Sequence, residues 1–507
     1  MTINQLKAGA SLSYISIILT SVIGILITPY MIKKLGTSEY GLYTLIGAFI
    51  GYLTLLDFGL NNTIIRFTAK YRAKKDKEGE AVFLGTSFII YSIISLIIVI
   101  IGVVLYFNIE NIFGNSLTLK ELNKAKTMSL ILIFNVAITL PGGIFFGIST
   151  GYEKFIFPRA SRIIKYLIRS ILLVSILFYE ADSIGIVILD TIMNILLIIA
   201  NAYYVLNVIK INVKFKGINK ELLKEIFSYS FWIFLIALTH LFQWRSGQLA
   251  LGITINTSVV AIYGIGVMLG GFFGAFGAAI SGVFLPKATH MVVSNNSPTK
   301  LTNMMIRIGR ISLIVLLYIL GAFILYGQEF IILWLGNDYI DSWFVALMIM
   351  LIMTFSFSQS FGNSILEARK MIRFRALFFL TSLIIGTFTG ALLSIRFSIK
   401  GMIAGIIIAM FINQIGINIY YKHKIHLEIT RFFKETFSKF ILPFILSLMV
   451  GHLTNHLVEI SWVGFLIKSI LYTLFYSIFI ILLGMNLYEK QLFSNYIKSI
   501  YYITQKK

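Results

Sequence analysis

Residues 82–107 read VFLGTSFIIYSIISLIIVIIGVVLYF and contain no charged side chain. A helix needs about 20 mostly apolar residues to cross a bilayer, where each backbone N–H and C=O group must be satisfied within the segment. This run is therefore long enough for one transmembrane helix. Similar runs recur along the chain and predict about 14 transmembrane helices. The predicted spans are 9–32, 40–63, 82–107, 127–150, 163–180, 184–206, 227–250, 258–283, 309–327, 343–366, 376–395, 401–421, 440–457 and 463–485.

Composition supports the same fold class. The chain has 507 residues, of which 58% are hydrophobic and 13% are charged. An ordinary soluble domain has about 25% charged residues, so a soluble fold of this length would lack the polar surface to cover itself. The chain contains no cysteine, which excludes disulfide bonds, thiolate metal sites and cysteine nucleophiles. We therefore expect an all-α integral membrane protein.

The charge that is present is mostly positive, with 43 Lys and Arg against 21 Asp and Glu and a formal net charge of +22. A basic chain suggests nucleic acid or an anionic membrane as partner, and the apolar excess favours the membrane. Most basic residues fall on the side of the predicted spans that holds the N-terminus, most densely in the loop 66–77. Because Lys and Arg accumulate in cytoplasmic segments, both termini are predicted to be cytoplasmic. Nucleic acid is not needed to explain the charge.

The sequence does not favour an enzyme. No connection between predicted spans is long enough for a soluble catalytic domain, and no glycine is followed by lysine, so a P-loop for ATP is absent. His452 and His456 share a helical face, but the HExxH pattern is missing and Glu459 is the only carboxylate nearby in sequence, so a metal site is not favoured. We expect no catalytic residue and no cofactor.

Two short patterns occur twice in the chain. Residues 11–14 (SLSY) and 227–230 (FSYS) open the first and the seventh predicted span, and 39–43 (EYGLY) and 261–265 (AIYGI) begin the spans that follow. Six spans separate the copies, and an even number keeps both halves in the same orientation. The pattern predicts two parallel-repeat six-helix bundles with two helices appended, an architecture found in transporters. The predicted domains are 1–206, a cytoplasmic linker 207–226, a second bundle 227–421, and a C-terminal part 422–507 that holds the last two helices and the tail.

Ionisable side chains inside predicted spans are functional candidates, because burying a charge in a bilayer is costly. Arg245 lies past the middle of the seventh span, accompanied by His240 and Gln243. We expect these three side chains to line the substrate pathway. Asp57 and Asp190 are candidates for ion coupling or for a charge pair. The alternative is a structural ion pair, or a helix end that lies nearer the membrane surface.

Polar and small residues add further patterns. Gln359, Asn363 and Glu367 recur every four residues and share one helical face, which must turn towards protein or water. Gln359 and Asn363 are candidates for the pathway, and Glu367 is a candidate for the charge pair. Ladders of small residues predict close helix packing. They comprise Gly266, Gly270, Gly274, Ala278 and Gly282 in the eighth span, and Gly143, Gly147 and Gly151 in the fourth.

The N-terminal part of the chain resembles a known family. Residues 35–43 (LGTSEYGLY) and 51–60 (GYLTLLDFGL), followed by the basic segment 66–77, closely resemble the bacterial polysaccharide flippases. These Wzx-like transporters belong to the MOP superfamily, which also holds the MATE drug exporters and the lipid II flippase. Residues 248–252 (QLALG), with Tyr263 and Gly264, form a weaker second match.

The resemblance implies two bundles around a central, often cationic cavity in the bacterial cytoplasmic membrane. It implies that the substrate is a short oligosaccharide on undecaprenyl pyrophosphate, moved by alternating access to the outer face for O-antigen, capsule or a similar surface polysaccharide. A proton or sodium gradient is implied as the energy source. Besides membrane lipids, a polysaccharide polymerase and other assembly proteins are implied as partners.

Two alternatives remain open from the residues. A MATE-like exporter of small cations shares the superfamily, although a basic cavity around Arg245 would repel such substrates. A membrane-embedded polymerase or glycosyltransferase would act on the same lipid-linked sugars, although such enzymes usually need a sizeable external loop or a cytoplasmic active-site segment.

Overall fold

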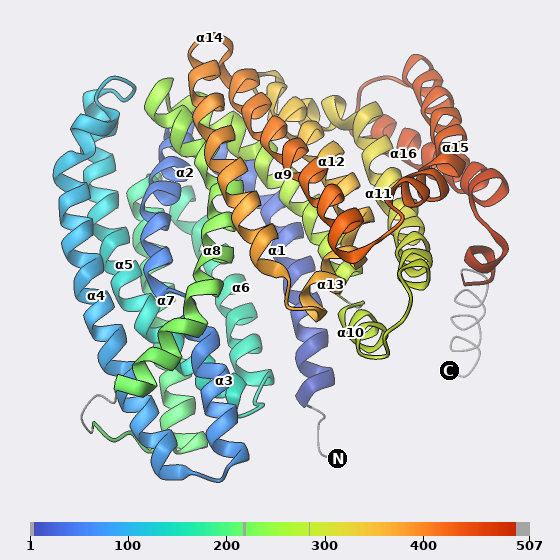
Figure 1. The fold of residues 1–507 in the computed structure, drawn as a ribbon. Helices are drawn as coiled ribbons and strands as arrows, with labels where there is room; N and C mark the ends of the chain where they lie inside the picture. The colour runs from blue at the N-terminus through green and yellow to red at the C-terminus, as the bar shows by residue number, and fades with distance from the viewer. Residues whose placement is uncertain (1–4, 216–219, 283, 493–507) are drawn as a thin grey trace, which may run out of the picture. The chain divides into compact units, whose positions relative to one another are not determined.

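The computed structural model describes residues 5–215, 220–282 and 284–492, and these residues form an all-helical protein (Figure 1). Contacts divide the chain into two compact units. Unit 1 comprises Met1–Gly264 and Leu383–Ile406, and unit 2 comprises Ile265–Ser382 and Ile407–Lys507. The predicted linker 207–226 and the C-terminal tail lie partly outside the described residues. The repeat-based domain boundaries differ from these contact-based units and stay a prediction.

The helices before residue 255 belong to unit 1. They are α1 (Gln5–Leu35), α2 (Thr37–Gly51), η1 (Tyr52–Asp57), α3 (Leu60–Ala73), α4 (Lys77–Phe113), α5 (Leu119–Gly151), α6 (Ile156–Phe178), α7 (Ser183–Tyr203), η2 (Tyr204–Ile209) and α8 (Lys220–Thr254).

The remaining helices lie in unit 2 or cross between the units. They are α9 (Thr257–Gly282), α10 (Leu285–Val293), α11 (Pro298–Leu335), η3 (Asn337–Tyr339), α12 (Asp341–Ser358), α13 (Ser360–Ala368), α14 (Ile372–Tyr420), η4 (Tyr421–Ile425), α15 (Ile429–Leu457), α16 (Trp462–Phe479) and η5 (Ile480–Gly484).

Eleven helical segments among the described residues are long and apolar enough to cross a membrane. The protein is therefore a multi-pass membrane protein, as the sequence predicts. One of these segments, 373–425, contains the break at Ser398 in α14, so it holds two of the predicted spans. The predicted spans 163–180 and 227–250 correspond to α6 and α8, which carry more polar side chains and fall outside the eleven. The number of fourteen spans stays a prediction.

The break in α14 joins two antiparallel helices that approach closely. Ser398 has a positive φ of 49°, which reverses the chain between the predicted spans 376–395 and 401–421. A Cβ atom on Gly405 would lie 2.4 Å from the Cα atom of Gly390, and one on Gly401 would lie 2.4 Å from the carbonyl oxygen of Leu393. Only glycine lets the two backbones come this close.

The predicted span 40–63 is interrupted in the structure. The chain turns at Phe58 and Gly59, which both have positive φ, and then continues as α3 to Ala73. Much of the basic segment 66–77, which the sequence suggested to be a loop, is therefore helical. The expectation was wrong because Lys, Arg and Ala are good helix formers, so the helix continues after the apolar run has ended. The loop itself shortens to the turn before α4, where Asp76 accepts a hydrogen bond from the N–H of Gly79 at 2.7 Å.

Packing within each unit follows the small-residue ladders. In unit 2, a Cβ atom on Gly266 would lie 2.5 Å from Cβ of Val345, and one on Gly270 would lie 2.7 Å from a side-chain carbon of Ile349. In unit 1, Gly147 approaches α3 in the same way. Close helix packing is thus confirmed at Gly266, Gly270 and Gly147. It is not found at Gly143, where a Cβ atom would have no other atom within 4 Å.

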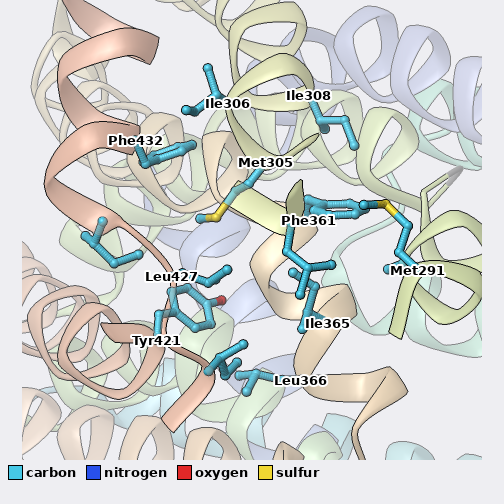
Figure 2. Close-up of a cluster of buried hydrophobic side chains, with 14 of the residues drawn as sticks. Met291, Met305, Ile306, Ile308, Phe361, Ile365, Leu366, Tyr421, Leu427 and Phe432 are labelled. Atoms are coloured by element: carbon cyan, nitrogen blue, oxygen red, sulfur yellow. The ribbon is translucent and has the colours of Figure 1, made fainter. Parts of the chain in front are cut away.

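The apolar core of unit 2 holds its short helices in place. Met291 of α10 lies beside Phe361 of α13, and Met305 of α11 and Tyr421 of η4 belong to the same cluster (Figure 2). Phe361 is fully buried. This cluster anchors α10 and α13, which are too short to be stable on their own.

Candidate functional site

A cavity of about 390 Å³ lies within unit 1 between α1, α5, α6 and α7. Its wall is unusually polar for a membrane protein. It includes Ser16 and Thr20 from α1, Asn135 from α5, and Asp190 and Asn194 from α7. Polar groups at membrane depth are tolerated where they line a water-filled cavity or contact one another.

Three basic side chains from α6 complete this wall: Arg162, Lys165 and Arg169, here called the α6 basic cluster. Their spacing of three and then four residues places them on one face of the helix. On the opposite face, Ile164 and Ile171 are more than half exposed, as expected for side chains that contact lipid. The helix therefore separates charge towards the protein from apolar surface towards the bilayer.

Among the described residues, Asp190 is the only acidic one in the wall of this cavity. It accepts a hydrogen bond from Nε of Arg169 and a second from Nη2 of Arg169 at 3.1 Å. The hydroxyl of Tyr43 donates a third at 3.2 Å. Asp190 is thus part of a charge pair, as the sequence suggested as one alternative. One carboxylate facing three basic groups leaves the cavity with an excess of positive charge.

An amide network fixes the second member of the cluster. Lys165 donates to Oδ1 of Asn194, and the amide of Asn194 donates to Asn135 at 2.8 Å. Asn135 in turn donates to the hydroxyl of Thr191 at 3.1 Å. The network ties α5 to α7 and orients the Lys165 ammonium group without neutralising its charge.

Arg245 lies in α8, outside the lining of this cavity. Its Nη1 donates to the backbone carbonyl of Gly47 at 3.2 Å, and a Cβ atom on Gly51 would lie 3.4 Å from the same nitrogen. The side chain is exposed, and no carboxylate among the described residues pairs with it. A guanidinium group has five N–H donors, so most of those of Arg245 remain available to a ligand.

The two neighbours predicted with Arg245 occupy different positions. His240 is exposed and its ring lies 6.3 Å from that of Trp244, whereas Gln243 is half-buried. Neither lines the cavity beside the α6 basic cluster. Their place on the substrate pathway stays a prediction.

Asp57 lies where the second predicted span breaks. Its carboxylate accepts a hydrogen bond from the hydroxyl of Tyr91 at 2.6 Å and also from the backbone N–H groups of Gly59 and Asn61. These contacts hold the turn at Phe58 and stabilise the start of α3. No basic side chain forms an ion pair with Asp57 within the described parts of the chain, so the structure favours a role in shaping the helix break.

The predicted amide face lies in unit 2. Gln359 is almost fully buried and bonds to Asn418 at 2.8 Å and to Gln414, both from α14. Asn363 accepts a hydrogen bond from the hydroxyl of Tyr421 at 2.7 Å. Glu367 is exposed near the end of α13. The face therefore turns towards protein, and these two amides are engaged in helix packing.

Sequence reasoning missed the α6 basic cluster as a site. All three lie close to the start of the predicted span 163–180, where basic residues are expected to indicate membrane orientation. Their spacing was the available signal: it confines three charges to one face of a helix whose other face is apolar. The sequence did not show that this face turns towards α7 and Asp190.

Comparison with known proteins identifies the family and the fold. Residues 6–292 match the family model "Polysaccharide biosynthesis protein". The fold is similar to that of the lipid II flippase MurJ in an inward closed conformation, with a TM-score of 0.70, 18% identity, and coverage of 93% of this chain and 97% of MurJ. No curated protein matches the chain by sequence.

Two MATE transporters share the fold as well. A multidrug resistance MATE transporter in an inward-facing conformation has a TM-score of 0.61 and 14% identity, over 82% of this chain and 94% of its own. The eukaryotic MATE transporter AtDTX14 has a TM-score of 0.55 and 17% identity, over 85% of this chain and 98% of its own. The chain thus shares the fold of the lipid II flippase MurJ and of these MATE transporters. Because the family model covers more than half of the chain, the protein belongs to the polysaccharide biosynthesis protein family.

Proposed function

We propose that this protein moves a lipid-linked oligosaccharide across the membrane, with an undecaprenyl pyrophosphate carrier, for the synthesis of a surface polysaccharide. The observation that carries the proposal is the cavity of unit 1, where Arg162, Lys165 and Arg169 face the single carboxylate of Asp190. The excess positive charge suits an anionic head group. Membership of a polysaccharide biosynthesis family and a fold shared with a lipid II flippase support it.

The residue types fit this substrate class. Arginine presents a planar fork of donors that matches phosphate and carboxylate, and it keeps its charge at any relevant pH. Arg162 and Arg245 are not neutralised by a carboxylate among the described residues, so both can receive an anionic group of the substrate. The lipid tail can remain in the bilayer while the sugar head group crosses by alternating access. A proton or sodium gradient is the energy source that we propose for this movement, in the cytoplasmic membrane of a bacterium.

Complementation of a deletion strain tests the proposal. The double variant Arg162→Ala/Lys165→Ala should reduce surface polysaccharide and cause the lipid-linked sugar to accumulate, because the cavity then loses two of its three basic groups. Arg159→Ala is the matched control on the same helix, since Arg159 packs over the ring of Phe155 and does not line the cavity. Protein levels are compared by immunoblot. Wild-type polysaccharide in the double variant would contradict the proposed role.

A second candidate function is the export of small cations, which the MATE fold favours. The sign of the charge in the cavity distinguishes the two functions, because an excess of positive charge would repel a cationic substrate. Transport of a cationic dye by the purified protein, inhibited by neither variant of α6, would favour export. Absence of dye transport by the purified wild-type protein, together with loss of polysaccharide in the double variant, would favour the flippase.

A further inference from the structure

A second basic cavity, of about 460 Å³, lies at the end of unit 1 that the charge distribution predicts to be cytoplasmic. We call it the end cavity. Its lining residues lie around the turn between α3 and α4, which Figure 1 shows at the lower left, just after the end of α5, and in the segment around the end of η2. It is separate from the cavity beside the α6 basic cluster, because the two share no lining residue.

Three lysines line the end cavity: Lys75 from the turn, Lys77 from the start of α4, and Lys210 from the end of η2. We call them the lysine triad. All three side chains are exposed, and none forms an ion pair or a side-chain hydrogen bond within the described residues. Three unpaired ammonium groups around one cavity repel one another, so an anion between them would be stabilised.

The two acidic residues in the wall are already engaged. Asp76 caps the start of α4 by accepting the N–H of Gly79. Glu80 is buried, hydrogen-bonds to the hydroxyl of Tyr152 and interacts with Arg72, whose guanidinium group lies 4.4 Å from the ring centre of Tyr152. Arg72 offsets Glu80, and Asp76 forms no ion pair with the lysine triad among the described residues. Four basic residues (Arg72, Lys75, Lys77 and Lys210) line the end cavity against two acids, so an excess of positive charge remains.

The segment that lines one side of the end cavity with residues 209–212 also carries exposed apolar side chains. Leu206 and Val208 of η2, together with Phe215 beyond it, are each more than half exposed, and we call them the apolar flank. The N–H of Lys214 donates to the carbonyl of Ala81 at 3.0 Å, which lays this segment along the start of α4. Apolar surface next to an unpaired basic cavity is the combination that a lipid with an anionic head group requires.

The positioning of three lysines around one cavity is not needed to orient the protein in the membrane. The positive-inside rule depends on how many basic residues a segment carries, and Lys74 meets it without facing the cavity. Convergence of three lysines from three separate elements on one hollow is an additional feature. It depends on the tertiary contacts of α3, α4 and η2.

We propose that the end cavity binds the phosphate group of an anionic membrane lipid, held by the lysine triad, with the lipid chains along the apolar flank. The shared chemistry is a lipid phosphate, and its source is either a resident phospholipid or the lipid carrier of the substrate. Binding of a resident phospholipid does not depend on the proposed flippase activity.

Native mass spectrometry of the purified full chain in detergent tests the proposal. Phosphatidylglycerol, undecaprenyl pyrophosphate and zwitterionic phosphatidylcholine are added separately as probes. The variant Lys77→Gln/Lys210→Gln should bind the anionic probe about 30-fold more weakly than the wild type, because each lysine near a membrane contributes about 1 kcal/mol. The control Lys74→Gln/Lys154→Gln removes the same charge from exposed lysines that do not line the end cavity.

The two sources give different results. Selective loss of phosphatidylglycerol binding supports the site with a resident phospholipid, and selective loss of undecaprenyl pyrophosphate binding supports it with the substrate carrier. Equal binding of both anionic probes by the variant and the control would overturn the proposal. Phosphatidylcholine that binds the wild type as tightly as the anionic probes would also overturn it. Melting curves of both variants check that the fold is retained.

Discussion

Arg169 and Asp190 form a two-point contact between α6 and α7, in which Nε and Nη2 of the guanidinium group donate to the two carboxylate oxygens. Both side chains are largely buried, with 18% and 24% of their surface exposed. The contact sets the charge of the cavity in unit 1, because Asp190 offsets Arg169 and leaves Arg162 and Lys165 uncompensated.

Arg169→Ala should destabilise the protein by about 3 kcal/mol, since it leaves a partly buried carboxylate without its partner. The double variant Arg169→Gln/Asp190→Asn removes both charges and should restore most of the thermal stability. If the pair is only structural, the double variant will also restore polysaccharide export. A double variant that is stable but inactive places Arg169 on the substrate pathway. Thermal unfolding in detergent and complementation measure the two quantities.

Arg245→Ala should reduce translocation about tenfold or more, because a charge-assisted hydrogen bond contributes about 1.5–3 kcal/mol. Arg245→Lys keeps the charge and should retain more activity than the alanine variant. Surface polysaccharide at matched protein levels is the measurement. Full activity in Arg245→Ala would show that Arg245 does not act on the substrate and that its hydrogen bond to Gly47 only supports helix packing.

Asp57→Ala should lower stability by about 1–3 kcal/mol, because Tyr91 and the backbone N–H groups at the helix break lose their acceptor. Asp57→Asn keeps an acceptor oxygen and should be milder. Transport by Asp57→Asn is measured at several pH values and sodium concentrations. An unchanged dependence is expected if Asp57 only shapes the break, and an altered one would indicate ion coupling.

Glu329→Gln should cost about 3–5 kcal/mol of stability, because it leaves the ammonium group of Lys468 buried without a charged partner. Nζ of Lys468 lies 2.8 Å from Oε2 of Glu329, and only 1% and 8% of the two side chains are exposed. Glu329→Gln/Lys468→Met removes both charges and should recover much of the loss. A single variant as stable as the wild type would show that the pair does not hold α16 against α11.

Asp182 should make the stability of the folded protein depend on pH in the acidic range. Burial acts to raise its pKa, but hydrogen bonds from Lys124 and from the N–H groups of Gly185 and Ile184 outweigh this and hold the pKa below its ordinary value of 3.8. The contribution to stability is therefore complete above that value and is lost as the pH falls through the lowered pKa. Because the side chain is 39% exposed, the effect should stay below about 1 kcal/mol.

Thermal unfolding of the wild type and of Asp182→Asn, followed from about pH 6 to about pH 3, measures this effect. The wild type should lose more stability on acidification than the variant. Identical acid profiles would show that the ion pair of Asp182 with Lys124 does not stabilise the folded state.

The uncharged runs allowed the fold class and most membrane segments to be predicted, because a bilayer demands long apolar helices whatever their contacts. The break at Phe58 and the helical nature of 66–73 were missed. The first depends on the contact between Asp57 and Tyr91, and the second on helix propensity beyond the apolar run. Among the candidate site residues, Asp190 forms an ion pair with Arg169, a partner that the sequence analysis did not identify.

The sequence by itself determined that the chain is an all-helical membrane protein, and it predicts that the basic residues lie mainly on one side of the membrane. Both properties follow from local composition, which the bilayer acts on directly. Only the tertiary structure decided which charges face the protein. Arg162, Lys165 and Arg169 lie on one helical face in any α6, but they become a candidate anion site only because α7 brings Asp190 and Asn194 against that face.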